Sequence, residues 1–266
     1  MIASLDAWVR RRWREIVGAC FVIAATIGVT WYFLENPYNQ TFGNTVTDVQ
    51  LRGKYVALTY DDGPNPPYTD EIVDYLHKEK VPATFFLVGM AVAKYPASVK
   101  REVDDGNAVG NHSWDHAHLV LETRRHIQRQ IEMTDQAIFD ASGEHTKLFR
   151  PPFGARDYAV IQVAHDLGYQ VIMWSVPLAR DWERPAPQVI ADRVTRRVTN
   201  GSIIVLHDGN KGIGGDREPT VEATKLIVQE LRAEGYQFVT VPELMRLGVY
   251  SGGTPPPGSD DMGGEP

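Results

Sequence analysis

The sequence predicts an α/β domain of parallel strands and surrounding helices, preceded by one membrane-spanning helix. Short apolar runs alternate with amphipathic runs from Lys54 to Thr240, and this alternation favours parallel strands with helices outside. Reactive residue types follow four of the apolar runs, as expected where loops gather beyond strand ends. An apolar segment behind a group of arginines predicts the membrane helix. The pattern alone leaves an open sheet and a barrel as alternatives.

The N-terminal region is basic and then apolar. Residues 1–15 include four arginines between positions 10 and 14, whereas residues 16–34 are uncharged and end in Trp31, Tyr32 and Phe33. About 20 apolar residues in a helix cross a hydrocarbon layer of about 30 Å, and preceding arginines stay in the cytoplasm. We therefore expect a cytoplasmic N-terminus at 1–15 and an uncleaved, single-pass signal anchor in the cell membrane at 16–34. A cleaved signal peptide is the alternative, but no small-residue cleavage site follows.

The rest of the chain divides by composition. Residues 35–53 are polar and predict a linker, residues 54–250 predict the folded domain, and residues 251–266, rich in Gly, Pro and Asp, predict a disordered tail. The domain is expected outside the cytoplasm.

Strands are expected where short apolar runs end at turn residues. The first ends at an Asp-Asp-Gly-Pro turn, and the second, ATFFLV, is apolar throughout, as in a buried strand. The later runs are shorter but have the same boundaries. In order, the expected strands are residues 55–60, 83–88, 108–110, 148–150, 170–174, 202–206 and 237–240.

Helices are expected where apolar residues recur with helical spacing. The first is expected to begin at a Thr69 cap, and the long third helix to end at Gly143. In order, the expected helices are residues 69–79, 97–105, 122–141, 158–167, 187–198 and 220–234.

Composition excludes some classes of protein. The chain has 266 residues, 43% hydrophobic and 23% charged, which suits one sizeable globular domain. The net charge of −7 offers no basic surface, so nucleic-acid binding is not expected. Cys20 is the only cysteine, and an internal disulfide is impossible.

Two segments contain residue types that bind metals. Asp61 and Asp62 follow the first strand, where adjacent side chains point apart and can take different roles. His112 and His116 follow the third strand, and a helix there would put both imidazoles on one face. Three protein ligands with open positions are typical of a catalytic metal site. Ordinary turn residues and surface histidines are the alternative for each segment taken alone.

Two further strand ends carry charged residues. Arg150 precedes two prolines that stiffen its loop, and it can orient Asp61. His207 ends a buried strand, where an imidazole suits proton donation to a leaving amine. A structural turn and a structural histidine are the alternatives, and the four strand ends together favour a catalytic site.

These segments, in this order, resemble the polysaccharide deacetylases of carbohydrate esterase family 4, also called the NodB-homology domain. The resemblance covers Lys54 to Gly248 and depends on the combination of TYDDGP, HSWDH, RPPFG, RDW and VLHDG. It implies a distorted (β/α) barrel and a hydrolase that removes acetyl groups from an N-acetylated polysaccharide.

The resemblance also implies catalytic roles. Asp61 corresponds to the catalytic base and Arg150 to the residue that orients it. Asp181 corresponds to an aspartate that pairs with this arginine, and His207 to the general acid. Leu178 stands where the family has another aspartate, so this chain departs from the family's pattern in that loop.

Metal and substrate positions follow from the same resemblance. The ligands of a divalent ion, Zn²⁺ first with Co²⁺ or a similar ion as alternative, would be Asp62, His112 and His116. The expected substrate-binding residues are Tyr60, Phe153 through its backbone N–H, Trp182 and Val205.

The expected substrate is an N-acetylated glycan of the cell envelope, with N-acetylglucosamine in peptidoglycan favoured because the chain is anchored and carries no appended binding module. Removal of O-acetyl groups from xylan and deacetylation of chitin oligosaccharides are alternatives. A catalytically silent glycan-binding domain is an alternative of another class, and the complete set of polar residues argues against it.

Overall fold

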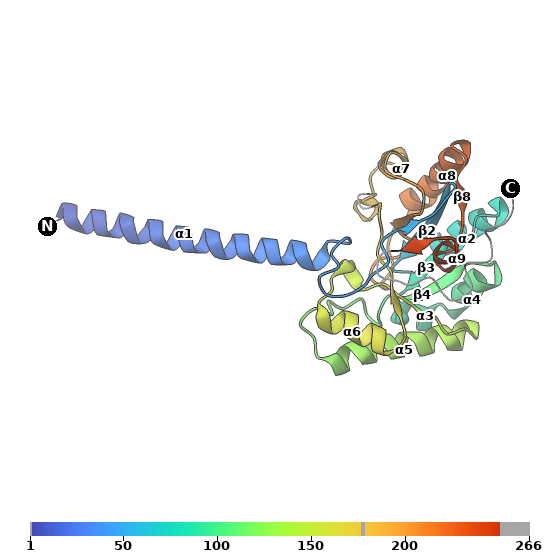
Figure 1. Cartoon of the computed structure of the whole chain (residues 1–266), viewed down its shortest axis with the longest axis horizontal. Helices are drawn as coiled ribbons and strands as arrows, with labels where there is room; N and C mark the ends of the chain where they lie inside the picture. The colour runs from blue at the N-terminus through green and yellow to red at the C-terminus, as the bar shows by residue number, and fades with distance from the viewer. Residues whose placement is uncertain (1, 177–178, 251–266) are drawn as a thin grey trace.

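The computed structural model describes residues 2–176 and 179–250, with side chains described at residue 8 and from residue 12 onward. Leu178 and the expected tail at 251–266 therefore lie outside the described residues. A long helix, α1 (Ile2–Glu35), projects from an α/β domain that contains the other elements (Figure 1).

The central sheet is parallel and curled. Its strand order is β6-β5-β4-β3-β2-β7, and β8 pairs with the start of β2. Beyond β6, Val176 forms a parallel bridge with Ile204 of β7, so the two edges approach each other. The expected distorted barrel is confirmed. The strands are β2 (Tyr55–Asp61), β3 (Thr84–Leu87), β4 (Ala108–Asn111), β5 (Leu148–Phe149), β6 (Gln170–Val171), β7 (Ser202–His207) and β8 (Gln237–Phe238).

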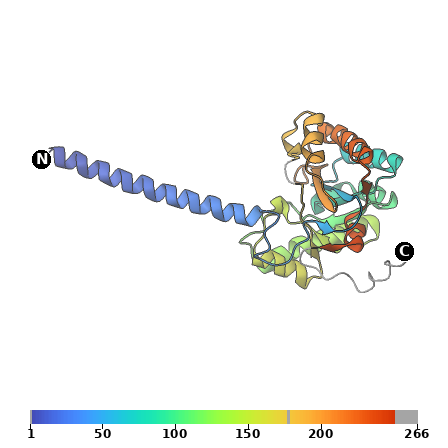
Figure 2. The ribbon, with the colours of Figure 1, turned by 45° about the horizontal axis from the view of Figure 1, so that its top comes forward.

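Helices surround the sheet on the outside (Figure 2). Helix α5 ends at Gly143 with φ of 81°, as predicted. The first helix of the domain starts one residue before Thr69, after Pro67, so the predicted Thr69 cap is wrong. The helices are α2 (Tyr68–Glu79), α3 (Gly89–Lys94), α4 (Pro96–Asp104), α5 (Arg124–Ser142), α6 (Tyr158–Asp166), α7 (Pro187–Thr195), α8 (Glu218–Ala233) and α9 (Val241–Leu247), with 3-10 turns η1 (Pro152–Gly154) and η2 (Asp181–Glu183).

The largest core cluster lies between the middle strands and the outer helices. Leu58, Phe85 and Ile204 from three adjacent strands are fully buried, together with Leu76 of α2 and Ile227 of α8. Burying each of these side chains contributes roughly 1.5–3 kcal/mol. The strands are thereby held in fixed positions, and so are the loops that follow them.

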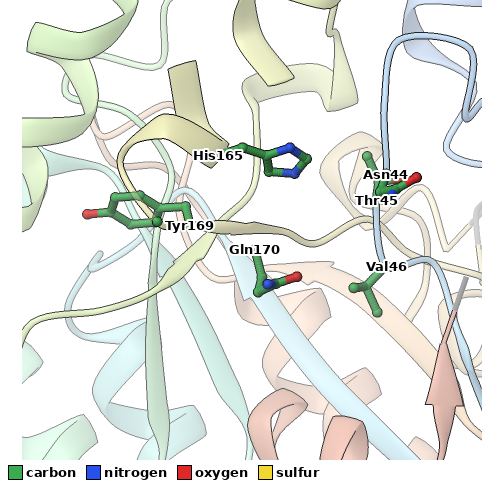
Figure 3. A pocket seen from close by; sticks show the side chains of 7 residues that line it. Asn44, Thr45, Val46, His165, Tyr169 and Gln170 are labelled. Atoms are coloured by element: carbon green, nitrogen blue, oxygen red, sulfur yellow. The ribbon is translucent and has the colours of Figure 1, made fainter. Parts of the chain in front are cut away.

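Part of the expected linker is folded against the domain. Val46 and Val49 are buried, and Val46 exchanges backbone hydrogen bonds with residues 171 and 173. Strand β1 (Val49–Gln50) pairs antiparallel with β9 (Val249–Tyr250). The linker prediction is wrong here, because these contacts involve partners far away in the sequence. Figure 3 shows residues 44–46 across a pocket from His165.

Helix α1 has the composition of a membrane span. The most apolar 18-residue window within its segment Arg12–Glu35 has a mean hydropathy of 2.0, and none of this window is buried. A core helix of a soluble protein would bury most of that surface. The helix is therefore long and apolar enough to cross a membrane.

Candidate active site

The carboxyl ends of β2, β4, β5 and β7 meet at one edge of the sheet, beside a pocket of about 870 Å³. Adjacent parallel strands deliver their C-terminal residues to the same edge, so segments far apart in the sequence become neighbours. The predicted residues that line the pocket are Asp61, Asp62, His112, His116, Phe153, Trp182, Val205 and His207.

Arg150 lies behind the pocket and fixes Asp61. Its guanidinium is fully buried, and Nη1 donates to Asp61 Oδ1 at 2.6 Å and to Thr59 Oγ1 at 2.8 Å. Nε and Nη2 donate to the carbonyls of Ile172 and Met173. Nearly every donor of the buried cation is satisfied, and one oxygen of Asp61 is held in place.

Arg150→Ala is expected to lower the free energy of unfolding by about 3–5 kcal/mol, because it leaves the buried Asp61 carboxylate unpaired. Urea unfolding of the full chain in detergent, followed by tryptophan fluorescence, measures the change. Arg101→Ala is the control, since the Arg101–Asp74 pair is exposed and such pairs contribute about 0–1 kcal/mol. Equal urea midpoints for the two variants would contradict the structural role of Arg150.

Asp62, His112 and His116 form a buried cluster that can hold a metal ion. Their ligand atoms all lie within 4.8 Å of one another, and Asp62 Oδ1 lies 3.0 Å from His116 Nε2 and 3.6 Å from His112 Nε2. His112 Nδ1 donates to the carbonyl of Arg150 at 2.7 Å. This bond orients the ring and leaves Nε2 free to bind a metal.

The electrostatics of the cluster also suit a cation. Asp62 Oδ1 is buried without a hydrogen-bond partner. Burial by itself would raise the pKa of Asp62, but contact with His116 and the nearby His207 and His112 hold it well below its ordinary value. Burial lowers the pKa of His112 to about 4. A charged carboxylate and a neutral imidazole are the protonation states that metal ligands require.

Backbone turns, and not a helix, bring the ligands together. Residues 112–116 are not helical, and Ser113 and His116 have φ of 66° and 56°, so the helical interpretation of this segment is wrong. Asp62 has φ of 78°. Left-handed backbone costs a residue with a side chain about 1–3 kcal/mol, and such residues concentrate at functional sites.

Two glycines allow the Asp61–Asp62 loop and the His207–Asp208 loop to touch. A Cβ on Gly63 would lie 2.1 Å from Asp208 Oδ2, and a Cβ on Gly209 would lie 2.1 Å from the carbonyl oxygen of Asp62. Both distances are far inside van der Waals contact. The glycines of the two motifs are therefore required by the approach of one loop to the other.

His207 is held and charged by Asp181. Its Nδ1 lies 2.9 Å from Asp181 Oδ1, and its backbone N–H donates to Asp181 Oδ2 at 2.7 Å. Burial alone would lower the pKa of His207, but Asp181, with smaller contributions from Asp62 and Asp61, raises it to about 9. Asp181 thus pairs with His207 and not with Arg150, which corrects the sequence prediction. The cause is turn η2, which lies against the end of β7.

The open side of the pocket is aromatic. Trp182 is 47% exposed, with its ring 5.2 Å from that of His207, and Phe153 packs edge-on against His116 at 4.5 Å. Val205 also lines the pocket and is 4% exposed. The three side chains form walls on which a sugar ring can lie.

Tyr60 is not in the pocket. It is fully buried, its ring stacks on Phe85 at 5.1 Å, and its hydroxyl bonds to Thr224 Oγ1 at 3.0 Å. The prediction that Tyr60 binds substrate is therefore wrong. Side chains alternate along β2, so Tyr60 faces the helices while Thr59 and Asp61 face the arginine.

Several pocket residues were missed by the sequence analysis. Asn210 and Lys211 directly follow the His-Asp-Gly motif, and that position beyond a strand end was a usable signal. The other missed residues are Glu35, Pro37, Trp174, Arg184, Gly215, Asp216 and Arg217. Of these, Arg184 lies two residues after the Arg-Asp-Trp motif.

One aspartate and two histidines that can hold a metal ion, with a second carboxylate and a further histidine beside them, are the arrangement of a metal-dependent hydrolase. The family model for polysaccharide deacetylases matches residues 48–172. A peptidoglycan-N-acetylglucosamine deacetylase from Bacillus cereus is 37% identical over 205 residues, which cover 77% of this chain and 94% of the relative. This chain belongs to the polysaccharide deacetylase family.

Solved structures agree with this assignment. The structure of a peptidoglycan N-acetylglucosamine deacetylase bound to 4-naphthalen-1-yl-N-oxidanyl-benzamide superimposes with a TM-score of 0.70 at 30% identity, covering 74% of this chain and 91% of the other. A CE4 family pseudoenzyme from Bacillus anthracis has a TM-score of 0.68 at 31% identity, with 74% and 67% covered. The predicted family and fold are confirmed.

Proposed function

We propose that this chain removes acetyl groups from N-acetylglucosamine residues of peptidoglycan in a metal-dependent hydrolysis. The observation that carries the proposal is the pocket in which the Asp62–His112–His116 cluster lies beside Asp61 and His207. The Bacillus cereus relative supports the choice of glycan.

The proposed roles follow from the positions of the side chains. Asp61, held by Arg150, accepts a proton from the attacking water. His207, kept protonated by Asp181, gives a proton to the departing amine, and the backbone N–H of Phe153 is proposed to hold the oxyanion. A divalent ion bound to the cluster would supply Lewis-acid polarisation of the acetamide carbonyl and a lower pKa of water.

We propose Zn²⁺ as the ion, with Co²⁺ or a similar ion as the alternative. The set of two imidazoles and one carboxylate favours Zn²⁺ over Mg²⁺ or Ca²⁺, which prefer oxygen ligands alone.

The structural similarity to a CE4 family pseudoenzyme is the observation that supports the alternative of a catalytically silent glycan-binding domain. The completeness of the pocket favours catalysis, because the proposed base, acid and metal ligands are all buried or half-buried side chains of the required type. Asp61 and Asp62 are buried, as are both histidines of the cluster, and His207 has its orienting partner.

Helix α1 is proposed to be a signal anchor, with the N-terminus in the cytoplasm and the domain outside. The exposed apolar surface within Arg12–Glu35 and the four arginines before the apolar residues 16–34 support this orientation.

The proposal is tested by acetate release from peptidoglycan, chitin oligomers and acetylated xylan, with and without chelator. The expected result is fastest release from peptidoglycan, loss with chelator, and recovery when Zn²⁺ is added back. Preferential release from xylan would favour the removal of O-acetyl groups as the function. Release from none of the three would favour a catalytically silent glycan-binding domain.

Asp181→Asn is expected to move the alkaline limb of kcat/KM to lower pH. The proposed general acid must be protonated, so the rate falls as pH rises through the pKa of His207. Asp181 is the main group that raises this pKa to about 9, and removing its charge lowers it. The pH profiles of the variant and the wild type, loaded with the same metal, measure the shift.

The control is Glu183→Gln, which removes an exposed carboxylate from the same 3-10 turn. It should leave the alkaline limb in place. An unchanged limb in Asp181→Asn would show that His207 is not the proton donor.

A further inference from the structure

The end of α1 is joined to the domain by a buried clamp and not by a free tether. The guanidinium of Arg156 donates to the carbonyls of Asn36, Pro37 and Asn39, at 2.8, 3.1 and 2.7 Å. The backbone N–H of Arg156 donates to the carbonyl of Leu34 at 3.1 Å. Arg156 is 1% exposed. Three chain carbonyls bound by one buried cation fix the direction in which the helix leaves the domain.

The clamp lies beside the catalytic pocket. Glu35, the last residue of α1, lines that pocket together with Pro37. Trp31 on the last turns of the helix lies 5.1 Å from the ring of His118, which stacks at 4.2 Å on Phe153 of the pocket wall. A continuous path of contacts therefore joins the apolar helix to the site.

The face of the domain next to α1 also exposes apolar side chains. Leu121 is 93% exposed and Tyr158 is 64% exposed. They are neighbours, because Leu121 N–H donates to Asp157 Oδ2 at 3.0 Å. Asp157 directly follows Arg156, the residue of the clamp. Tyrosine is enriched at the membrane–water interface.

These observations determine how far the pocket lies from the membrane surface. The apolar span ends at Glu35, so a helix that crosses the membrane places Glu35 at the outer interface, and the pocket that it lines lies there too. Figure 1 places α6 near the end of α1, with α2 and α4 on the far side of the domain. A flexible linker would let the pocket sample many heights, but the clamp permits one.

We infer that the catalytic pocket is held at the outer surface of the membrane and acts on glycan chains anchored there by a lipid, at the sugars next to that lipid. This inference rests on the deacetylase activity and the anchoring proposed above. Glycan chains that lie far from the membrane could reach the pocket only by bending back to the membrane surface.

The test moves the pocket and maps where the acetyl groups are lost. An insertion of eleven helical residues before Trp31, four leucines followed by seven polar residues, keeps the span and the clamp intact. The four leucines take the place of residues 31–34 in the membrane, so the domain rises by the full eleven residues, about 16 Å, and about three whole turns preserve its orientation. The control places the same eleven residues in reverse order before Ile16, on the cytoplasmic side.

Each full-length protein is reconstituted in vesicles with a hexamer of N-acetylglucosamine coupled to a diacyl lipid, and mass spectrometry locates the deacetylated sugars. Wild type and control should act on the sugars nearest the lipid, whereas the raised variant should act on the distal sugars. The same pattern in all three proteins would overturn the inference. A soluble hexamer should be deacetylated at equal rates by all three. A wild-type protein that releases acetate neither from this hexamer nor from peptidoglycan would instead refute the proposed function.

Depth-dependent quenching gives an independent readout. A fluorophore is attached at Leu121→Cys or at Lys78→Cys, each in a Cys20→Ser background, because Cys20 is the chain's only cysteine. Lys78 lies on α2 and is exposed. Lipids with a nitroxide headgroup should quench the label at position 121 severalfold more than at position 78. Equal quenching would show that this face does not contact the membrane.

Discussion

Asp61→Asn should lower turnover at least about a hundredfold while the protein keeps its metal. An amide cannot accept the proton of the attacking water, and general-base catalysis contributes roughly 10²–10⁴-fold. The metal cluster consists of Asp62 and the two histidines, so its affinity for the ion should be largely unchanged. Acetate release and metal content of the same preparation measure both quantities.

The matched control is Asp115→Asn. Asp115 lies in the loop between His112 and His116, but it is exposed, so the variant should keep wild-type turnover. Retained turnover in Asp61→Asn would refute the proposed base. Loss of the metal in that variant would show that Asp61 is a ligand itself, and its Oδ2 lies 4.0 Å from His112 Nε2.

His112→Ala should abolish metal binding and turnover together. The substitution removes one of three protein ligands and also the ring that is oriented by the carbonyl of Arg150. Loss of a group that hydrogen-bonds to a metal ligand costs roughly 10–100-fold in metal affinity or activity. Loss of a ligand itself should cost more. Metal content after dialysis and acetate release at saturating Zn²⁺ measure the two losses.

His77→Ala provides the control, since His77 is an exposed histidine on α2, away from the pocket. It should retain the metal and full activity. A His112→Ala protein that still binds one equivalent of metal would show that the ion is held elsewhere. Turnover that returns with added Zn²⁺ would instead show a weakened but correctly placed site.

Much of the fold could be predicted because its signals are local. Apolar runs of strand length, such as residues 55–60, and helical spacing, as in residues 122–141, report on neighbours within a few residues. Gly143 ended its helix as predicted. Helix α3 and strand β1 were missed because six and two residues are too few to show a period.

The site, like the fold, could be predicted in part. The types of residue at the strand ends indicated metal-dependent hydrolysis, and the strand ends meet because parallel strands share an edge. The partner of Asp181 was predicted wrongly, because the short turn η2 decides which side chain Asp181 reaches. Tyr60 was placed in the pocket although the alternation along β2 turns it into the core.

By itself, the sequence determined the order of the longer strands and helices, the chemistry available at the strand ends and the apolar character of α1, since each depends on residues close together in the chain. Only the tertiary structure decided that Asp181 supports His207, that residues 44–50 pack on the barrel, and that Arg156 clamps the end of the helix beside the pocket. Those contacts join residues separated by 26 to more than 100 positions, and no local pattern encodes which distant partner a side chain meets.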